Sequence, residues 1–286
     1  EQKGMYGKGW RTSWKQKSIS VFAAIIFFSG VLYWLLDPEK PGITRWMVQW
    51  IPVSVEEQLS EMALTQLFPN QQTCSTRKGD RALETLMLSL ISRDDLYRYK
   101  IEIIRSPQFN ALAFPGGKLV LFGGLLESLP SAESLAGILA HEIQHVRLQH
   151  GTQNLMRQLA FSGMVKLMAS DSGAFLEQML EGAKTLAILN YSRSFETEAD
   201  LGASELLKQQ RFSQDFLIQA FRAFENNEEV LDSAVPQYFS THPDLNERIK
   251  YLENQNRSLE SSGTGKILNP QSWKELKNIC ANVNSR

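Results

Sequence analysis

The 286-residue sequence carries almost no net charge and contains few cysteines and histidines. Because 30 Lys and Arg residues face 31 Asp and Glu residues, the formal charge of -1 gives no reason to expect a nucleic-acid partner. The only cysteines are Cys74 and Cys280, and the sequence leaves open whether they form a disulfide or remain unrelated thiols. Since 43% of the residues are hydrophobic and 21% are charged, the chain can form one sizeable core.

One long stretch of the sequence lacks charged residues, and it runs from Ser18 to Leu36. At about 1.5 Å per residue in a helix, it is long enough to cross a hydrocarbon core of roughly 30 Å. Its end lacks the small residues that a signal-peptide cleavage site requires. Tryptophan favours the membrane–water interface, and five of the six tryptophans lie around this stretch: Trp10, Trp14, Trp34, Trp46 and Trp50. We therefore expect a single transmembrane anchor over residues 18–36.

Basic residues are unevenly distributed around the expected anchor. Five of them precede it within residues 1–17, whereas only Lys40 and Arg45 follow it closely. The positive-inside rule then places the N-terminal tail in the cytoplasm and the rest of the chain across an inner membrane. That side is the periplasm in a Gram-negative bacterium, or the intermembrane-space side in a mitochondrion. Prolines and a glycine just after the anchor predict a linker over residues 37–54.

The sequence after the linker predicts an α+β fold that is mainly helical and contains a small antiparallel β-sheet. Apolar residues recur at helical spacing in Val55–Leu67 and in Arg81–Ile91. The period then changes to that of strands, and a turn is expected at Pro115–Gly117. The three expected strands are Lys100–Arg105, Ala111–Phe114 and Lys118–Phe122.

A helix-start signal follows the expected sheet. Ser131 has the character of an N-cap, and we expect the helix after it to continue to about Arg157. Residues 159–190 are apolar but interrupted, which predicts a helical hairpin. The tail over residues 256–286 is expected to contain a short helix around Ser272–Ile279.

His141, Glu142 and His145 lie on this expected helix in the order His-Glu-Ile-Gln-His. Residues four apart project from the same helix face, so the two imidazoles can hold one metal ion. Glu142 is poorly placed as a ligand but well placed to reach a water molecule on the metal. Because zinc catalysis needs three protein ligands and one open position, a third ligand must lie elsewhere.

Two residues are candidates for the third ligand. On a continuous helix, His150 lies nine residues from His141, about half a turn around the axis, and points away from the metal. The glycine and histidine that follow the second ligand in metzincins are also missing. Glu196 is the better candidate. Asp200 lies four residues later on the same helical face, where it can accept a hydrogen bond from a ligand histidine.

Several segments resemble the membrane-associated gluzincin peptidases, which include the CAAX prenyl protease and the heat-shock protease HtpX. These segments are Asn110–Gly117, Leu139–Val146, Ser192–Asp200 and Ser240–Pro243 with Arg248. With one expected anchor, the chain is most similar to the single-span, quality-control members. The resemblance implies a zincin-type domain in which His141, His145 and Glu196 hold one Zn²⁺ per chain and Glu142 is the catalytic carboxylate. Gln144 replaces the glycine that is usual in these proteins, at a position that is not a ligand.

The same resemblance and the chemistry of zinc predict how the reaction proceeds. Glu142 is expected to take a proton from a zinc-bound water, which acts as the nucleophile, and to pass it to the leaving amine. A further group must stabilise the oxyanion, and the unranked candidates are His242, Arg248, Arg193 and Tyr191. Alternatively, His242 occupies the open zinc position at rest and acts as a plug.

The expected strand near Asn110 suggests how a substrate is held. An edge strand can pair with an extended peptide through main-chain hydrogen bonds, and the residues expected to do so are Asn110, Ala111, Leu112 and Ala113. The alternative is a strand that the helical hairpin buries.

These observations predict a zinc metallopeptidase domain over residues 55–255. The chain is expected to be a membrane-anchored zinc metalloendopeptidase that cleaves misfolded or regulated proteins. Its expected partners are protein or peptide substrates and, through the N-terminal helix, the membrane. One alternative is a zinc-bearing chaperone or assembly factor that binds clients with little cleavage. Another is a structural metalloprotein whose closed four-ligand site includes His242.

Overall fold

The computed structural model describes residues 22, 26–27, 29–30, 43–92, 94–158, 191–225, 241–256 and 265–281. The chain divides into two compact units, Glu1–Ile43 and Thr44–Arg286. The expected anchor over 18–36 lies largely outside the described residues, and the expected hairpin over 159–190 lies wholly outside them. Within the described ranges, no helix combines the length and the apolar character needed to cross a membrane.

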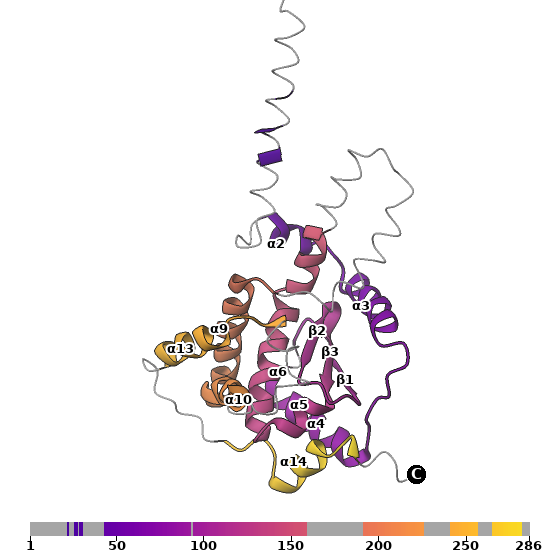
Figure 1. Cartoon of the computed structure of the whole chain (residues 1–286), viewed down its shortest axis with the longest axis vertical. Coiled ribbons are helices and arrows are strands. Elements are labelled where there is room, and N and C mark those ends of the chain that lie inside the picture. Colours follow the sequence, from indigo (N-terminus) through magenta and orange to yellow (C-terminus); the bar gives the residue numbers. More distant parts are fainter. Residues whose placement is uncertain are drawn as a thin grey trace, which may run out of the picture. The chain divides into compact units, whose positions relative to one another are not determined.

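Helices dominate the described part of the chain, and one small sheet lies among them, so the expected α+β class is confirmed (Figure 1). The helices are α2 (Ile43–Val48), α3 (Val53–Leu67), α4 (Arg77–Leu90), α5 (Gly123–Ser128), α6 (Ala132–Arg147), α9 (Arg193–Gln209), α10 (Asp215–Glu225), α13 (Leu245–Asn256) and α14 (Pro270–Lys277). Ser131 caps α6 as predicted, because its hydroxyl accepts a hydrogen bond from the Ser134 N–H at 3.1 Å. Helix α2 lies within residues 37–54, where we expected a linker.

The sheet is mixed rather than antiparallel. β2 (Ala111–Phe114) and β3 (Lys118–Phe122) form the expected antiparallel hairpin around the turn at Pro115–Gly117. β1 (Lys100–Ile104) pairs with the other side of β3 and runs parallel to it, which gives the strand order β1-β3-β2. The prediction of an antiparallel sheet was wrong for this pair. Strand periodicity identifies a strand but not its neighbour, and here β3 inserts between β1 and β2.

Both faces of the sheet are buried, each in its own core. Ala113 and Leu121 point into the larger core, which also contains side chains of α4, α5 and α6. Leu112 and Phe114 point the other way, into a smaller core with side chains of α3. Successive side chains of a strand alternate between faces, so a strand covered on both sides is apolar throughout, as β2 is.

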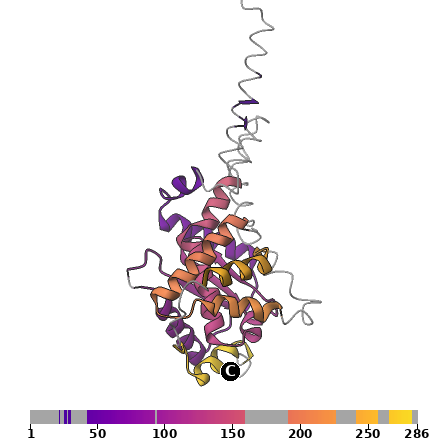
Figure 2. The same cartoon turned by 90° about the vertical axis from the view of Figure 1, so that its left-hand side faces the viewer.

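Helix α6 packs against both α9 and α10 and also contacts β2 (Figures 1 and 2). Gly137 allows α10 to cross closely, because a Cβ atom at this position would lie 2.5 Å from the backbone nitrogen of Leu217. Similarly, a Cβ atom on Gly202 of α9 would lie 2.7 Å from the side chain of Gln144. Close contacts on two sides therefore fix the helix that carries the metal motif.

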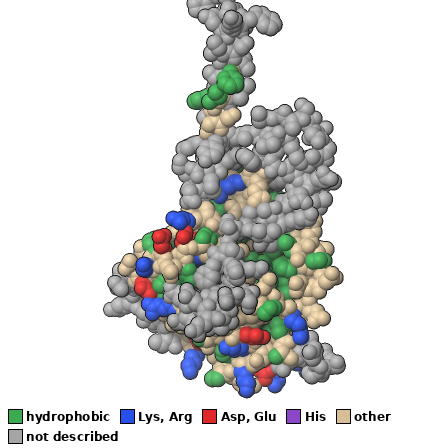
Figure 3. Space-filling view, viewed as in Figure 1, with side chains coloured by type: hydrophobic (Ala, Val, Ile, Leu, Met, Phe, Trp, Pro, Cys, Tyr) green, Lys and Arg blue, Asp and Glu red, His purple; other side chains and the backbone are tan. Residues whose placement is uncertain are grey.

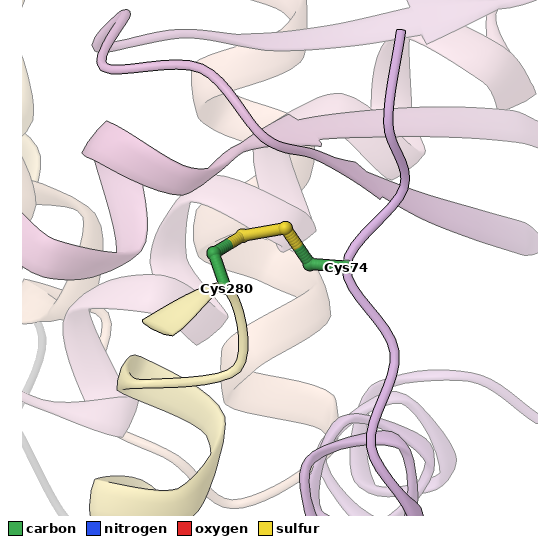
Figure 4. The surroundings of a disulfide bond; sticks show 2 residues. All are labelled: Cys74 and Cys280. Carbon is green, nitrogen blue, oxygen red and sulfur yellow. A yellow bond between two sulfur atoms is a disulfide. The ribbon is translucent and has the colours of Figure 1, made fainter. Parts of the chain in front are cut away.

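Cys74 and Cys280 form a disulfide across a sequence separation of 206, which answers the question that the sequence left open (Figure 4). Cys74 precedes α4, Cys280 follows α14, and these two helices pack against each other. The bond therefore ties the residues after α14 to the segment before α4, both within the unit Thr44–Arg286, which we call the main domain.

Candidate metal centre

The two histidines of the His-Glu-Ile-Gln-His motif meet on one face of α6. The Nε2 atoms of His141 and His145 lie 3.0 Å apart. All four histidines of the chain are at most 1% exposed, and none is visible on the face that Figure 3 presents. The four-residue spacing thus brings two ring nitrogens together in a buried site.

Glu196 and His242 complete a group of four potential metal donors. In the first turn of α9, Glu196 places Oε1 3.4 Å from Nε2 of His145 and Oε2 3.5 Å from Nε2 of His141. Nδ1 of His242 lies 3.0 Å from Oε1 of Glu196 and 3.4 Å from Nε2 of His141. One donor atom from each of the four residues lies within 4.8 Å of the others. The structure therefore brings together three expected ligands and the histidine whose role the sequence left open.

This donor set fits a zinc ion, which favours histidine nitrogen and carboxylate oxygen in four-coordinate sites. In each helix histidine, Nε2 faces the cluster and Nδ1 faces outward. Nδ1 of His141 lies 2.9 Å from Oδ1 of Asp200, the residue that the sequence suggested as its support, and Nδ1 of His145 lies 2.9 Å from Nδ1 of His150. An imidazole held through its Nδ1–H has a free lone pair on Nε2, which is the form that binds a metal.

Glu142 lies beside the donor cluster without belonging to it. Its carboxylate is fully buried, and neither oxygen accepts a hydrogen bond from the described residues. Oε1 is 3.6 Å from Nε2 of His242. Burial raises the pKa of Glu142 above its ordinary value. A carboxylate with a raised pKa is suited to accept and return a proton near neutral pH.

Arg248 of α13 binds the two carboxylates of α9. Its Nε and Nη2 donate to Asp200 at 2.7 Å each, and Nη1 lies 2.6 Å from Oε2 of Glu196. The guanidinium also lies over the ring of Phe221 at 4.6 Å. Although burial opposes ionisation, the charge of Arg248 lowers the pKa of both carboxylates. The same three residues line a cavity of about 260 Å³ beside α9 and α13.

His150 does not point away from the site, so the orientation predicted from a continuous helix was wrong. Helix α6 ends at Arg147, and Gln149 adopts a left-handed φ of 54° before a new helix begins at residue 150. This break turns the His150 ring toward His145. His150 is not among the four potential donors that the described residues bring together.

The other residues that the sequence suggested for oxyanion stabilisation or substrate binding lie around the donor cluster and make different contacts. Tyr191 stacks on the His145 ring with centroids 3.9 Å apart, and its hydroxyl donates to the Ala113 carbonyl at 3.4 Å. Arg193 is largely exposed and pairs with Asp244 at 2.6 Å. Among the described residues, β2 forms one edge of the sheet, and all four residues of the expected substrate strand are buried: Asn110, Ala111, Leu112 and Ala113.

Sequence reasoning missed the contact between His150 and His145 and the position of Glu198 beside the His150 ring. In the structure, Oε2 of Glu198 lies 3.5 Å from Nε2 of His150. The only available signal was the short spacing of the two histidines, since no local pattern identifies Gln149 as left-handed.

Comparisons with known proteins agree with this geometry. The profile of peptidase family M48 matches residues 76–256. The chain is 27% identical over 249 residues to the mitochondrial metalloendopeptidase OMA1 of Schizosaccharomyces pombe, which covers 82% of this chain and 70% of that protein. It is 32% identical over 169 residues to the mitochondrial metalloendopeptidase OMA1 of Homo sapiens, covering 54% of this chain but only 31% of the human protein. It is 24% identical over 188 residues to the metalloprotease YcaL of Escherichia coli, covering 64% and 72% of the two chains.

Proposed function

We propose, on the premise that the chain belongs to peptidase family M48, that it is a membrane-anchored zinc metalloendopeptidase acting on misfolded or regulated proteins. The observation that carries the proposal is the cluster of His141, His145 and Glu196 next to the buried Glu142. A buried carboxylate with a purely structural role needs a hydrogen-bonding partner. Neither oxygen of Glu142 accepts a hydrogen bond from the described residues, as suits a group that acts on an incoming molecule.

The roles of the individual residues follow from their contacts. When bound by His141, His145 and Glu196, zinc would supply Lewis-acid chemistry, polarising the scissile carbonyl and acidifying the attacking water. Glu142 accepts the proton of this water and later delivers it to the leaving amine. Arg248 is a positioning residue in this scheme, because it holds the Glu196 carboxylate and Asp200 together.

His242 is proposed to occupy the fourth donor position in the resting enzyme. Zinc catalysis leaves that position open for the reacting groups, so the His242 ring must withdraw before a substrate binds. Its Nε2 lies close to Glu142, and after a small displacement the ring can donate to the oxyanion. His242→Ala separates the two roles: cleavage becomes faster if the plug dominates, and slower by about 10²–10³ if the oxyanion contact dominates. Unchanged activity with unchanged zinc coordination refutes both.

Strand β2 is proposed to hold the substrate in an extended form. It is an edge of the described sheet, and Tyr191 bridges its Ala113 carbonyl to the ring of His145. A peptide that pairs with this edge would lie alongside the donor cluster and be recognised mainly through its backbone. Protein substrates with different side chains but extended, unfolded segments should therefore be cleaved at similar rates.

We also propose an inner-membrane location with the N-terminal tail in the cytoplasm and the peptidase domain in the periplasm, or on the intermembrane-space side if the protein is mitochondrial. The support is the basic residues before the apolar stretch Ser18–Leu36; the names of the two OMA1 relatives include the word mitochondrial. Carbonate extraction should leave the full chain in the membrane fraction, and deletion of residues 1–36 should release it. Release of the full chain would refute the anchor.

Cleavage of casein by the wild type and by Glu142→Gln tests the activity, with zinc content measured in both. We expect both proteins to bind one zinc and only the wild type to cleave, because the amide cannot accept the proton. Equal cleavage by the two would refute the mechanism. Zinc binding without cleavage by either would favour the alternative of a chaperone or assembly factor.

A further inference from the structure

The ring of His145 makes contacts of two different kinds. Nε2 faces the donor cluster, and Nδ1 lies 2.9 Å from Nδ1 of His150. A ring that binds a metal through Nε2 carries its proton on Nδ1, so His145 donates this hydrogen bond and His150 accepts it. The proton of the His150 ring is then on Nε2, which lies 3.5 Å from Oε2 of Glu198. Zinc on Nε2 of His145 therefore decides which nitrogen of each ring carries the proton.

His150 is itself held from two sides. Its ring stacks on Phe195 with centroids 4.1 Å apart and planes at 8°. On its Nε2 side, Glu198 is bound in turn by Arg45 of α2. His150 is fully buried, whereas Glu198 and Arg45 are partly exposed. The buried ring of His150 therefore lies next to an ion pair, Glu198 with Arg45, that reaches the protein surface.

We infer that Arg45, Glu198 and His150 form a positioning relay for the ligand His145. Arg45 holds Glu198, Glu198 orients the His150 ring, and His150 fixes the His145 ring with Nε2 toward the metal. The inference rests on the proposed function, because the relay has this role only if His145 binds zinc. The relay also connects α2, the segment after the expected anchor, to the metal centre.

The two helix histidines are supported by different acceptors. The Asp200 carboxylate lies 2.9 Å from Nδ1 of His141 itself. His145 instead faces the neutral ring of His150, and the Glu198 carboxylate lies on the far side of that ring. Without the His150 acceptor, the Nδ1–H of His145 would be buried without a partner. The stacking of Tyr191 on the ring would remain, but it does not decide which nitrogen faces the metal. Loss of such a supporting contact typically lowers metal affinity by about 10–100-fold.

Competition with a fluorescent zinc chelator, applied to the full chain, tests the role of His150. His150→Phe keeps a ring against Phe195 but removes the acceptor, and we expect its zinc Kd to rise by about 10–100-fold. His150→Asn loses the ring but keeps an acceptor oxygen near the position of Nδ1, and we expect it to recover most of the affinity. A purely structural role of the ring predicts the opposite order. Circular dichroism of the metal-free proteins checks that each variant folds.

Glu198→Ala provides a second test at a site where a folding defect is not expected, since this side chain is partly exposed. We expect a smaller rise in the zinc Kd than for His150→Phe. If Glu198 acts through His150, adding Glu198→Ala to His150→Phe should cause no further loss. Glu205→Ala is the matched control, because Glu205 lies on the same helix and its partners among the described residues are the nearby Lys208 and Gln209.

The outcomes distinguish the relay from the function on which it rests. A wild type that binds no zinc overturns the proposed function. A wild type that binds zinc, together with a His150→Phe Kd within about twofold of it, overturns the relay alone. Additive effects of the two substitutions would also overturn it, because Glu198 would then act independently of His150.

Discussion

The disulfide between Cys74 and Cys280 is expected to contribute much of the stability of the main domain. A crosslink restricts the unfolded chain, and in the chain-entropy view the stabilisation grows with the length of the closed loop. A loop of about 100 residues corresponds to about 4.7 kcal/mol, and each doubling adds about 0.6 kcal/mol. The separation of 206 residues therefore predicts about 5 kcal/mol, which is comparable to the whole stability of many domains.

Urea unfolding of the metal-free protein, followed by circular dichroism, measures this contribution. When both cysteines are replaced by alanine, the free energy of unfolding should fall by several kcal/mol. The m value should rise, because an unfolded chain without the crosslink exposes more surface. Wild type treated with a reducing agent is the control, and its curve should coincide with that of the double variant. A difference below about 1 kcal/mol would refute the loop-entropy argument.

Three further predictions concern single residues. Arg248→Met should destabilise the metal-free protein by about 3–5 kcal/mol in urea unfolding, because it leaves two buried carboxylates without their cation; an effect below about 1 kcal/mol would contradict this reading. Asp200→Ala should raise the zinc Kd by about 10–100-fold in a chelator competition. An unchanged Kd would show that Asp200 does not support His141 as a zinc ligand. Gly137→Ala should cost about 1–3 kcal/mol in thermal unfolding, because the new Cβ meets the backbone of Leu217. Gly265→Ala, whose Cβ would have ordinary contacts, is its control and should be nearly neutral.

Local signals in the sequence were sufficient for most element positions. Ser131 predicts the start of α6 and Pro115–Gly117 predicts the turn between β2 and β3, because both depend on residues adjacent in the chain. Helix α2 was missed since a helix of six residues has little stability of its own. It depends on contacts from elsewhere, such as the burial of Val48 and the ion pair of Arg45 with Glu198.

The donor residues differ in how far the sequence could place them. His141 and His145 share a helix face, so their convergence needs only a regular helix. Glu196 was found through its spacing to Asp200, which required a second helix but no knowledge of its packing. His242 is different, because 101 residues separate it from His141. Its place in the cluster depends on how α13 packs against α9 and α10, and helix-to-helix packing is not encoded in any local spacing.

His150 was misplaced for the opposite reason, since it lies close to the motif in sequence. A helical projection is valid only while the helix continues, and here the left-handed φ of Gln149 ends it. A non-glycine residue in that conformation costs about 1–2 kcal/mol, so favourable contacts must compensate. Two contacts of the His150 ring require the broken helix. The ring lies within hydrogen-bond distance of His145, and it stacks on Phe195. The break that makes the helical projection invalid therefore places the His150 acceptor behind His145, the proposed metal ligand. The orientation of His150 thus follows from tertiary contacts rather than from its distance along the chain.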